Sequence, residues 1–190
     1  MVEELANLCR RMQLSDKEKL FNTEAFKGTV RSLWAGHGGV TIRDIEENLF
    51  MVVVEAVFHE KDDMERVFVK SPWTFDKKLV QIVRFEGDLQ PTAITCTSSA
   101  FWIRVFNLPI KSMIWEVGED IGRAIGNLAK VDVPKNGLGW GKNLRIRVEV
   151  DVTKPLLRGK ILMGEVGEDD DPFWVNFKYE HLPSFCYRCG

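Results

Sequence analysis

The chain has 190 residues, of which 45% are hydrophobic and 28% are charged, and its formal net charge is −2. This composition is typical of one globular domain or two small ones, and it argues against a disordered chain and against a globally basic nucleic-acid protein. The longest apolar run, Leu49 to Val54, is too short to cross a bilayer, and the acidic start at Glu3 and Glu4 is unlike a signal peptide.

The first half of the chain predicts alternating helices and strands. Residues 2–12 place apolar side chains at i, i+3, i+4 and i+7, the spacing of an amphipathic helix. Asn22 or Thr23 can cap a second helix, and Pro72 follows the end of a third. The predicted elements are helices over 2–12, 22–34 and 60–69 and strands over 40–45, 49–58 and 79–85.

A polar, turn-rich stretch over 86–99 predicts a linker, after which the pattern restarts. The strongest signal follows at 143–152, where five apolar residues alternate strictly with polar ones, as in a strand that buries one face. This strand should be central or nearly central in its sheet. The predicted elements are strands over 101–106, 130–133, 143–152, 158–164 and 172–179 and a helix over 112–128.

Together these elements predict an α+β protein with two modules. The expected division is an N-terminal helical segment over 1–20, an α/β module over 21–86, a linker over 87–99, a second α+β module with an antiparallel sheet over 100–182, and a cysteine-containing segment over 183–190.

The closing segment carries a Cys-x-x-Cys motif formed by Cys186 and Cys189. Two thiolates at this spacing suit half of a tetrahedral zinc site, and the alternative is a pair of free thiols. His181 is poorly spaced for a third ligand, and a thioredoxin-type pair is disfavoured because that motif opens a helix. Cys9 and Cys96 are interpreted as bystanders. Four cysteines without a disulfide pattern favour an intracellular protein, nuclear or cytoplasmic.

Positive charge gathers between Arg123 and Lys160, where nine bases against three acids leave a net charge of +6. This window is either a phosphate-binding face or a solvated surface. The polar faces of the predicted strands combine aromatic residues with cations and one amide: Trp102, Arg104, Arg145, Arg147, Trp174, Asn176 and Lys178. Stacking planes beside cations suit single-stranded nucleic acid, whereas the alternative places both tryptophans in a core. No catalytic motif is present, so we expect no enzyme.

Several segments are distinctive as a set. The main ones are 148–156 (Val-Glu-Val-Asp-Val-Thr-Lys-Pro-Leu) and 177–190 (Phe-Lys-Tyr-Glu-His-Leu-Pro-Ser-Phe-Cys-Tyr-Arg-Cys-Gly), supported by 21–27, 33–34, 42–45, 48–50, 71–76, 101–105 and 108–109. Over roughly 21–190 the chain resembles a large plant family with a domain of unknown function and a zinc knuckle. Its members look like the gag-like first product of LINE-type retrotransposons.

This resemblance implies an RNA-recognition-like α/β module and a knuckle of the C-x2-C-x4-H-x4-C type. Cys186 and Cys189 match its first two zinc ligands, and the other two are expected beyond Gly190, so Zn²⁺ should be held tightly only by a full-length form. The first module departs from the recognition pattern as a degenerate copy would. No strand is expected before the helix at Asn22, and 49–58 lacks the usual stacking aromatics.

Two functions remain open. The first is a non-enzymatic, gag-like protein that binds single-stranded nucleic acid, RNA more than DNA. The second is a protein–protein interaction or self-assembly module, in which the sheet is an oligomer surface. The expected nucleic-acid contacts are Trp102, Arg104, Lys142, Arg145, Arg147, Lys178, Tyr187 and Arg188. Arg145 and Arg147 are expected to be exposed, to lack partners and to be removable with little effect on folding.

Overall fold

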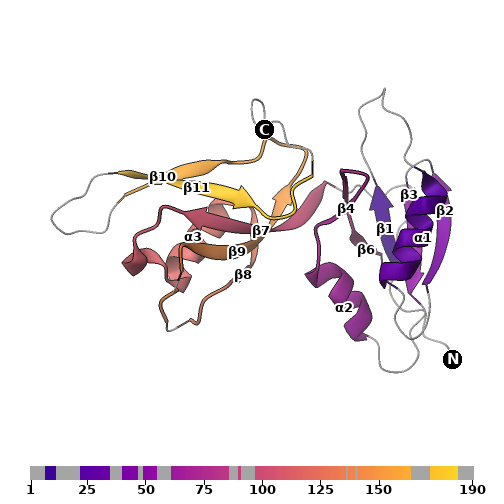
Figure 1. Ribbon diagram of the computed structural model, residues 1–190, viewed down its shortest axis with the longest axis horizontal. Coiled ribbons are helices and arrows are strands. Elements are labelled where there is room, and N and C mark those ends of the chain that lie inside the picture. Colours follow the sequence, from indigo (N-terminus) through magenta and orange to yellow (C-terminus); the bar gives the residue numbers. More distant parts are fainter. Residues whose placement is uncertain are drawn as a thin grey trace. The chain divides into compact units, whose positions relative to one another are not determined.

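In the computed structural model the chain divides into two compact units, residues 1–97 and 98–190 (Figure 1). The structure describes residues 7–11, 22–34, 40–46, 49–54, 61–85, 90, 97–135, 137–139, 141–163 and 172–183, and only the backbone of 7–11, 45–46, 49–54, 61–64 and 84–85. None of the helices in these ranges has both the length and the apolar character needed to cross a membrane.

The first unit is built around a four-stranded antiparallel sheet. Its elements are β1 (Asn7–Arg11), α1 (Thr23–Trp34), β2 (Val40–Glu46), β3 (Leu49–Val54), α2 (Lys61–Val69), β4 (Trp73–Phe75), β5 (Lys78–Val80) and β6 (Val83–Phe85). The sheet order is β2-β3-β1-β6, and β4 and β5 form a separate hairpin. A β-α-β-β-α-β chain order with β1 and β3 in the middle is the split βαβ arrangement, and RNA-recognition modules also carry a four-stranded sheet.

The helix predicted over 2–12 is wrong for Asn7–Arg11, which form strand β1. This strand pairs with β3 on one side and with β6 on the other, so long-range ladders override the local helical spacing. The first strand that the sequence analysis expected to be missing is therefore present. The strand predicted over 79–85 is also divided, because Gln81 and Ile82 separate β5 from β6.

Helix α1 begins with the predicted cap, since the backbone N–H of Ala25 donates to Oδ1 of Asn22 at 3.0 Å. Its buried residues are Phe26, Val30 and Trp34, spaced four apart on one face of the helix. They share a core with Val67 and Val80. The sequence predicts Phe26, Val30, Leu33 and Trp34 on one face of this helix; this is confirmed for the three buried residues and wrong for Leu33, which is 59% exposed.

The second unit contains a five-stranded antiparallel sheet and one α-helix among its described residues. Its elements are β7 (Ser98–Phe106), the 3₁₀ turn η2 (Ile110–Ser112), α3 (Trp115–Ile125), β8 (Asn127–Val131), β9 (Asn143–Asp151), β10 (Gly159–Leu162) and β11 (Phe173–Tyr179). The strand order is β10-β11-β7-β9-β8. The predicted strand over 143–152 is confirmed as β9, which has a neighbour on each side. The mixed α+β class is confirmed as well.

Several boundaries differ from the prediction: α3 begins at Trp115 rather than at 112, and β8 covers Asn127–Val131 rather than 130–133. Strand β7 begins at Ser98, inside the stretch expected to be a linker, because Ser98 and Ser99 pair with the end of β9. Helix α3 ends at Ile125 rather than at 128. A Cβ at Gly126 would lie 2.3 Å from the carbonyl oxygen of Glu149, so the chain passes close to β9 at this glycine and then enters β8.

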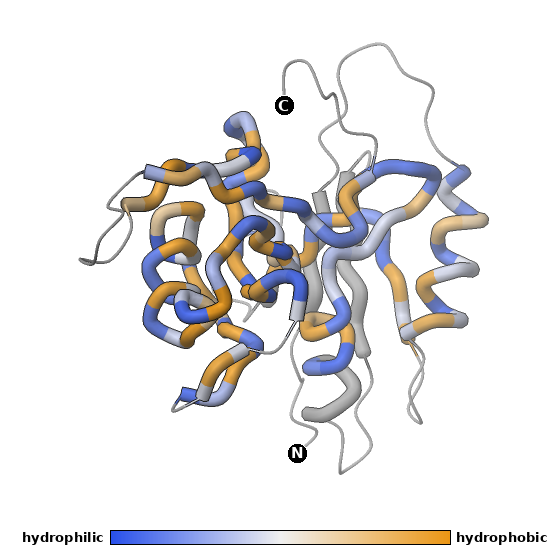
Figure 2. Tube along the Cα trace, turned by 60° about the vertical axis from the view of Figure 1, so that its left-hand side comes forward, coloured by the Kyte–Doolittle hydropathy of each residue, from blue (hydrophilic) through white to orange (hydrophobic). Residues whose placement is uncertain are grey.

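Helix α3 covers one face of this sheet. A Cβ atom at Gly118 of α3 would lie 3.2 Å from Cδ2 of Leu144. The side chain of Leu144 therefore lies on the face of the sheet that the helix covers. The residues buried on that side of β7 and β9 are Phe101, Ile103, Val105, Leu144, Ile146, Val148 and Val150. In Figure 2 apolar (orange) and polar (blue) residues follow one another along the coloured parts of the tube. Among the described residues of this unit, no helix packs on the opposite face, which we call the open face.

Candidate nucleic-acid interface

The open face brings together five of the predicted site residues. Across the β7–β9 ladder, Trp102 lies opposite Arg147 and Arg104 lies opposite Arg145. Across the β11–β7 ladder, Lys178 lies opposite Arg104. Directly paired residues of an antiparallel ladder project from the same side of the sheet. Residues far apart in sequence therefore form one aromatic and basic surface, as the alternating pattern predicted.

Trp102 is the centre of this surface. The guanidinium carbon of Arg145 lies 3.9 Å from the centre of the indole, and that of Arg147 lies 5.5 Å away. Both distances are those of cation–π contacts. Arg147 is 8% exposed, and its burial, followed by the charge of Arg145, lowers its pKa. Both guanidinium groups therefore lie beside the indole of Trp102.

Glu180 joins two of these arginines. It accepts hydrogen bonds from Nε and Nη2 of Arg145, at 3.1 and 2.8 Å, and from Nε of Arg104 at 2.6 Å. Asp132 lies 3.4 Å from Nη1 of Arg145. Burial raises the pKa of Glu180, but the hydrogen bonds and charges of Arg145 and Arg104 outweigh it, so the pKa lies below the usual value. The hydrogen bonds of Glu180 in turn raise the pKa of Arg145.

The expectation that Arg145 and Arg147 are exposed and without partners is wrong. Two carboxylates bind Arg145, and Arg147 is buried beside Trp102. Sequence reasoning missed Glu180 because it follows the predicted strand. The period-two pattern could have found it, since Glu180 continues the series of Asn176 and Lys178. Its backbone N–H also donates to the carbonyl oxygen of Trp102 at 2.8 Å, which extends the β11 pairing.

The more exposed cations surround this centre. The side chain of Arg104 is 51% exposed even though it is bound to Glu180. Lys178 is exposed, with its ammonium 5.0 Å from the centre of the Phe106 ring. Lys130 is exposed opposite Arg147 on the edge strand β8. Lys142 is exposed in the turn before β9. These side chains are the ones that a phosphate can reach from solvent.

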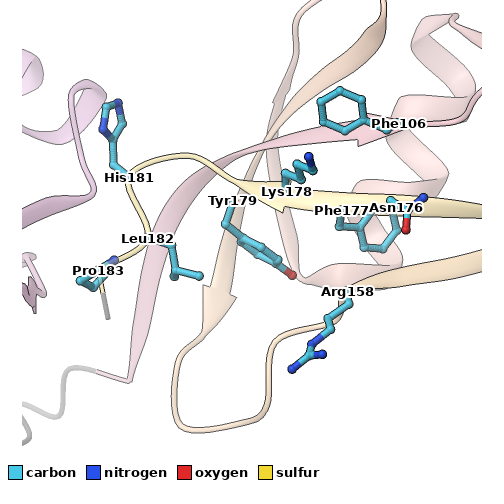
Figure 3. A pocket seen from close by; sticks show the side chains of 9 residues that line it. All are labelled: Phe106, Arg158, Asn176, Phe177, Lys178, Tyr179, His181, Leu182 and Pro183. Carbon is cyan, nitrogen blue, oxygen red and sulfur yellow. The ribbon is translucent and has the colours of Figure 1, made fainter. Parts of the chain in front are cut away.

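A pocket of about 770 Å³ adjoins the open face near the end of β11 (Figure 3). Phe106 and Lys178 lie on one side of the strand, and Tyr179 and Arg158 lie on the other (Figure 3). Tyr179 donates its hydroxyl to the carbonyl oxygen of Leu157 at 2.9 Å, and burial raises its pKa to about 12. The pocket thus combines aromatic surface with two cations. Its lining residues are Phe106, Arg158, Asn176, Phe177, Lys178, Tyr179, His181, Leu182 and Pro183.

The predicted zinc ligands Cys186 and Cys189, and the predicted contacts Tyr187 and Arg188, lie outside the described residues. Within the described ranges, no group of three or more His, Cys, Asp or Glu side chains could hold a metal ion. The fit to zinc therefore rests on the Cys-x-x-Cys spacing, which supplies two of four tetrahedral ligands.

A comparison with known families finds a match at the end of the chain. A family model described as a zinc knuckle, of the CCHC type, matches residues 150–190, which include β10, β11 and both cysteines of the motif. No curated protein and no solved structure matches the chain. The match supports a CCHC-type zinc knuckle in this closing segment, and modules of this class bind zinc and nucleic acids.

Proposed function

We propose that this chain is a non-enzymatic protein that binds single-stranded nucleic acid, RNA in preference to DNA, and that it acts inside the cell as the gag-like protein of a plant LINE-type retrotransposon. The observation that carries the binding proposal is the open face, where Trp102, Arg104 and Lys178 lie together. The preference for RNA and the retrotransposon role are supported by the family resemblance.

The chemistry of the open face suits a single strand better than a duplex. A base that is not paired can stack on an aromatic side chain, and the flexible backbone can follow cations spaced along a sheet. The side chains of neighbouring strands lie about 5 Å apart and those along one strand about 7 Å apart, which is comparable to the spacing of successive phosphates. The knuckle match supports the same class of partner.

Titration of labelled single-stranded RNA at several salt concentrations tests this proposal. Replacing Arg104 and Lys178 with alanine should weaken binding and make the slope of log affinity against log salt shallower by about 0.7 for each lost phosphate contact. A matched control removes two exposed cations away from the open face, Lys111 and Arg123. Equal affinity and slope in both double variants would refute binding through the open face.

A second candidate function is self-assembly. The observation that favours it is strand β10, which lies at the edge of the sheet and carries Ile161 at 58% exposure, with Met163 just beyond it at 72%. An exposed edge strand with apolar side chains can pair with a second copy of the chain. Sedimentation over a range of concentrations tests this, and a monomer at every concentration would rule it out.

A further inference from the structure

Trp174 is held in a fixed position on the open face although it is 47% exposed. Its indole N–H donates to Oδ1 of Asn176 at 2.9 Å. Its carbonyl oxygen accepts a hydrogen bond from Nδ2 of Asn107 at 2.8 Å. The one polar atom of this exposed side chain is hydrogen-bonded within its own strand, so the indole is preorganised. A ligand that stacks on it therefore need not order it first.

Glycine at position 159 makes room for this indole. A Cβ at Gly159 would lie 2.5 Å from Cζ2 and 2.6 Å from Cε2 of Trp174, and 2.2 Å from the carbonyl oxygen of Val175. Gly159 pairs with Asn176 across the β10–β11 ladder. The indole therefore lies directly against the backbone of the neighbouring strand, and 47% of the Trp174 surface remains exposed to solvent.

The hydrogen bond also fixes the direction of the Asn176 amide. An indole nitrogen can only donate, so the amide oxygen must face Trp174 and the NH₂ group must turn away from it. Among the described residues, this NH₂ group donates to no other atom. Lys178 follows two residues later on the same face, about 7 Å along the strand.

We propose that Trp174, Asn176 and Lys178 form a subsite for one nucleotide of a single strand. The base stacks on the indole, the amide NH₂ of Asn176 donates to an acceptor atom on the base edge, and the Lys178 ammonium binds the adjoining phosphate. This inference rests on the proposed function and deepens it. The subsite is distinct from the cluster of Trp102 with Arg145 and Arg147. Its three residues lie on one strand, so they contact the base and the phosphate of the same nucleotide.

Anisotropy titrations with labelled single-stranded oligouridine test the subsite. Trp174→Ala should weaken binding about 5- to 150-fold, the range for one stacked base, without changing the salt slope. Trp174→Phe should retain most of the affinity, because a ring remains. Asn176→Asp keeps an acceptor for the indole but loses the donor, and should also weaken binding. Trp115→Phe, on helix α3, is the matched control and should bind as the parent does.

The outcomes separate the subsite from the proposed function. If the parent binds oligouridine and a folded Trp174→Ala chain binds equally well, the subsite is refuted and the proposed function stands. If the parent does not bind at all, the proposed function fails and the subsite with it. If Trp174→Ala abolishes self-association and leaves RNA binding intact, Trp174 belongs to a protein contact, which also overturns the subsite. Thermal melts of each variant establish that it is folded.

Discussion

Replacing Glu180 with glutamine should destabilise the second unit and strengthen RNA binding at the same time. In the folded protein this carboxylate accepts three hydrogen bonds, two from Arg145 and one from Arg104. Glutamine has a similar size but carries no charge and has one acceptor oxygen. Among the residues that the structure describes, Asp132, which lies 3.4 Å from Arg145, is then the carboxylate left to pair with Arg145.

The size of the effect follows from burial. A net hydrogen bond to a charged group stabilises by about 1.5–3 kcal/mol, whereas an exposed ion pair contributes about 0.2–1 kcal/mol. The side chain of Glu180 is 12% exposed and that of Arg145 is 36% exposed, so this site lies between the two cases. We expect a loss of about 1.5 kcal/mol, which lowers the melting temperature of a unit this size by about 6–12 °C.

Binding should change in the opposite direction. Without the carboxylate, Arg104 and Arg145 are less neutralised, and each can contact a phosphate. The salt slope should steepen by about 0.7 for each new phosphate contact. The matched control is Glu119→Gln, which removes the same charge from α3 on the other face and costs about 0.3–0.5 kcal/mol with no change in binding. Unchanged melting and affinity in Glu180→Gln would refute the reasoning, and so would weaker binding by a folded variant.

Four further outcomes are expected. Val148→Asp places an unpaired carboxylate at a position that is 0% exposed, so urea denaturation should show a loss of at least about 3 kcal/mol. Arg145→Ala with Arg147→Ala should cost about 2–3 kcal/mol in the same assay, because these arginines are packed and bonded rather than free. The pKa of Glu180 is lower when folded than its ordinary 4.5, so the unfolded state binds more protons at low pH. Its contribution to stability should be complete above about pH 4.5 and decline as pH falls through the lower folded pKa, and Glu180→Gln should remove this part of an acid titration followed by circular dichroism. The 190-residue chain should retain well under one zinc per molecule after dialysis, since its motif supplies two of four ligands; metal analysis giving one zinc per chain would contradict this.

Local patterns predicted those parts of the fold that local physics decides. The alternation in β9 identified a strand with one buried face, because a shift of one residue would expose all of its apolar side chains. Strand β1 could not be predicted in this way. Its five residues fit a helical spacing, and only pairing with β3 and β6, far along the chain, makes them a strand.

In the candidate site, too, local patterns predicted some features, and long-range packing decided the others. Alternation placed Trp102 with Arg104 on one face of β7, and Arg145 with Arg147 on one face of β9, because period two is a property of each strand by itself. Of the two partners of Arg145, Glu180 continues the period-two series of β11, whereas Asp132 comes from a bend that only the assembled sheet brings beside Arg145. Burial of Arg147 likewise depends on which strands become its neighbours.

The end of β11 sets how the sheet and the knuckle cysteines can share a ligand. Six residues separate Tyr179 from Cys186, and even a fully extended chain of that length spans no more than about 25 Å. Under the proposed function, a strand bound beside the end of β11 therefore lies near the cysteine segment. The second encounter is then intramolecular, at an effective concentration of the order of millimolar. Two weak sites joined in this way retain a single strand longer than either site does separately.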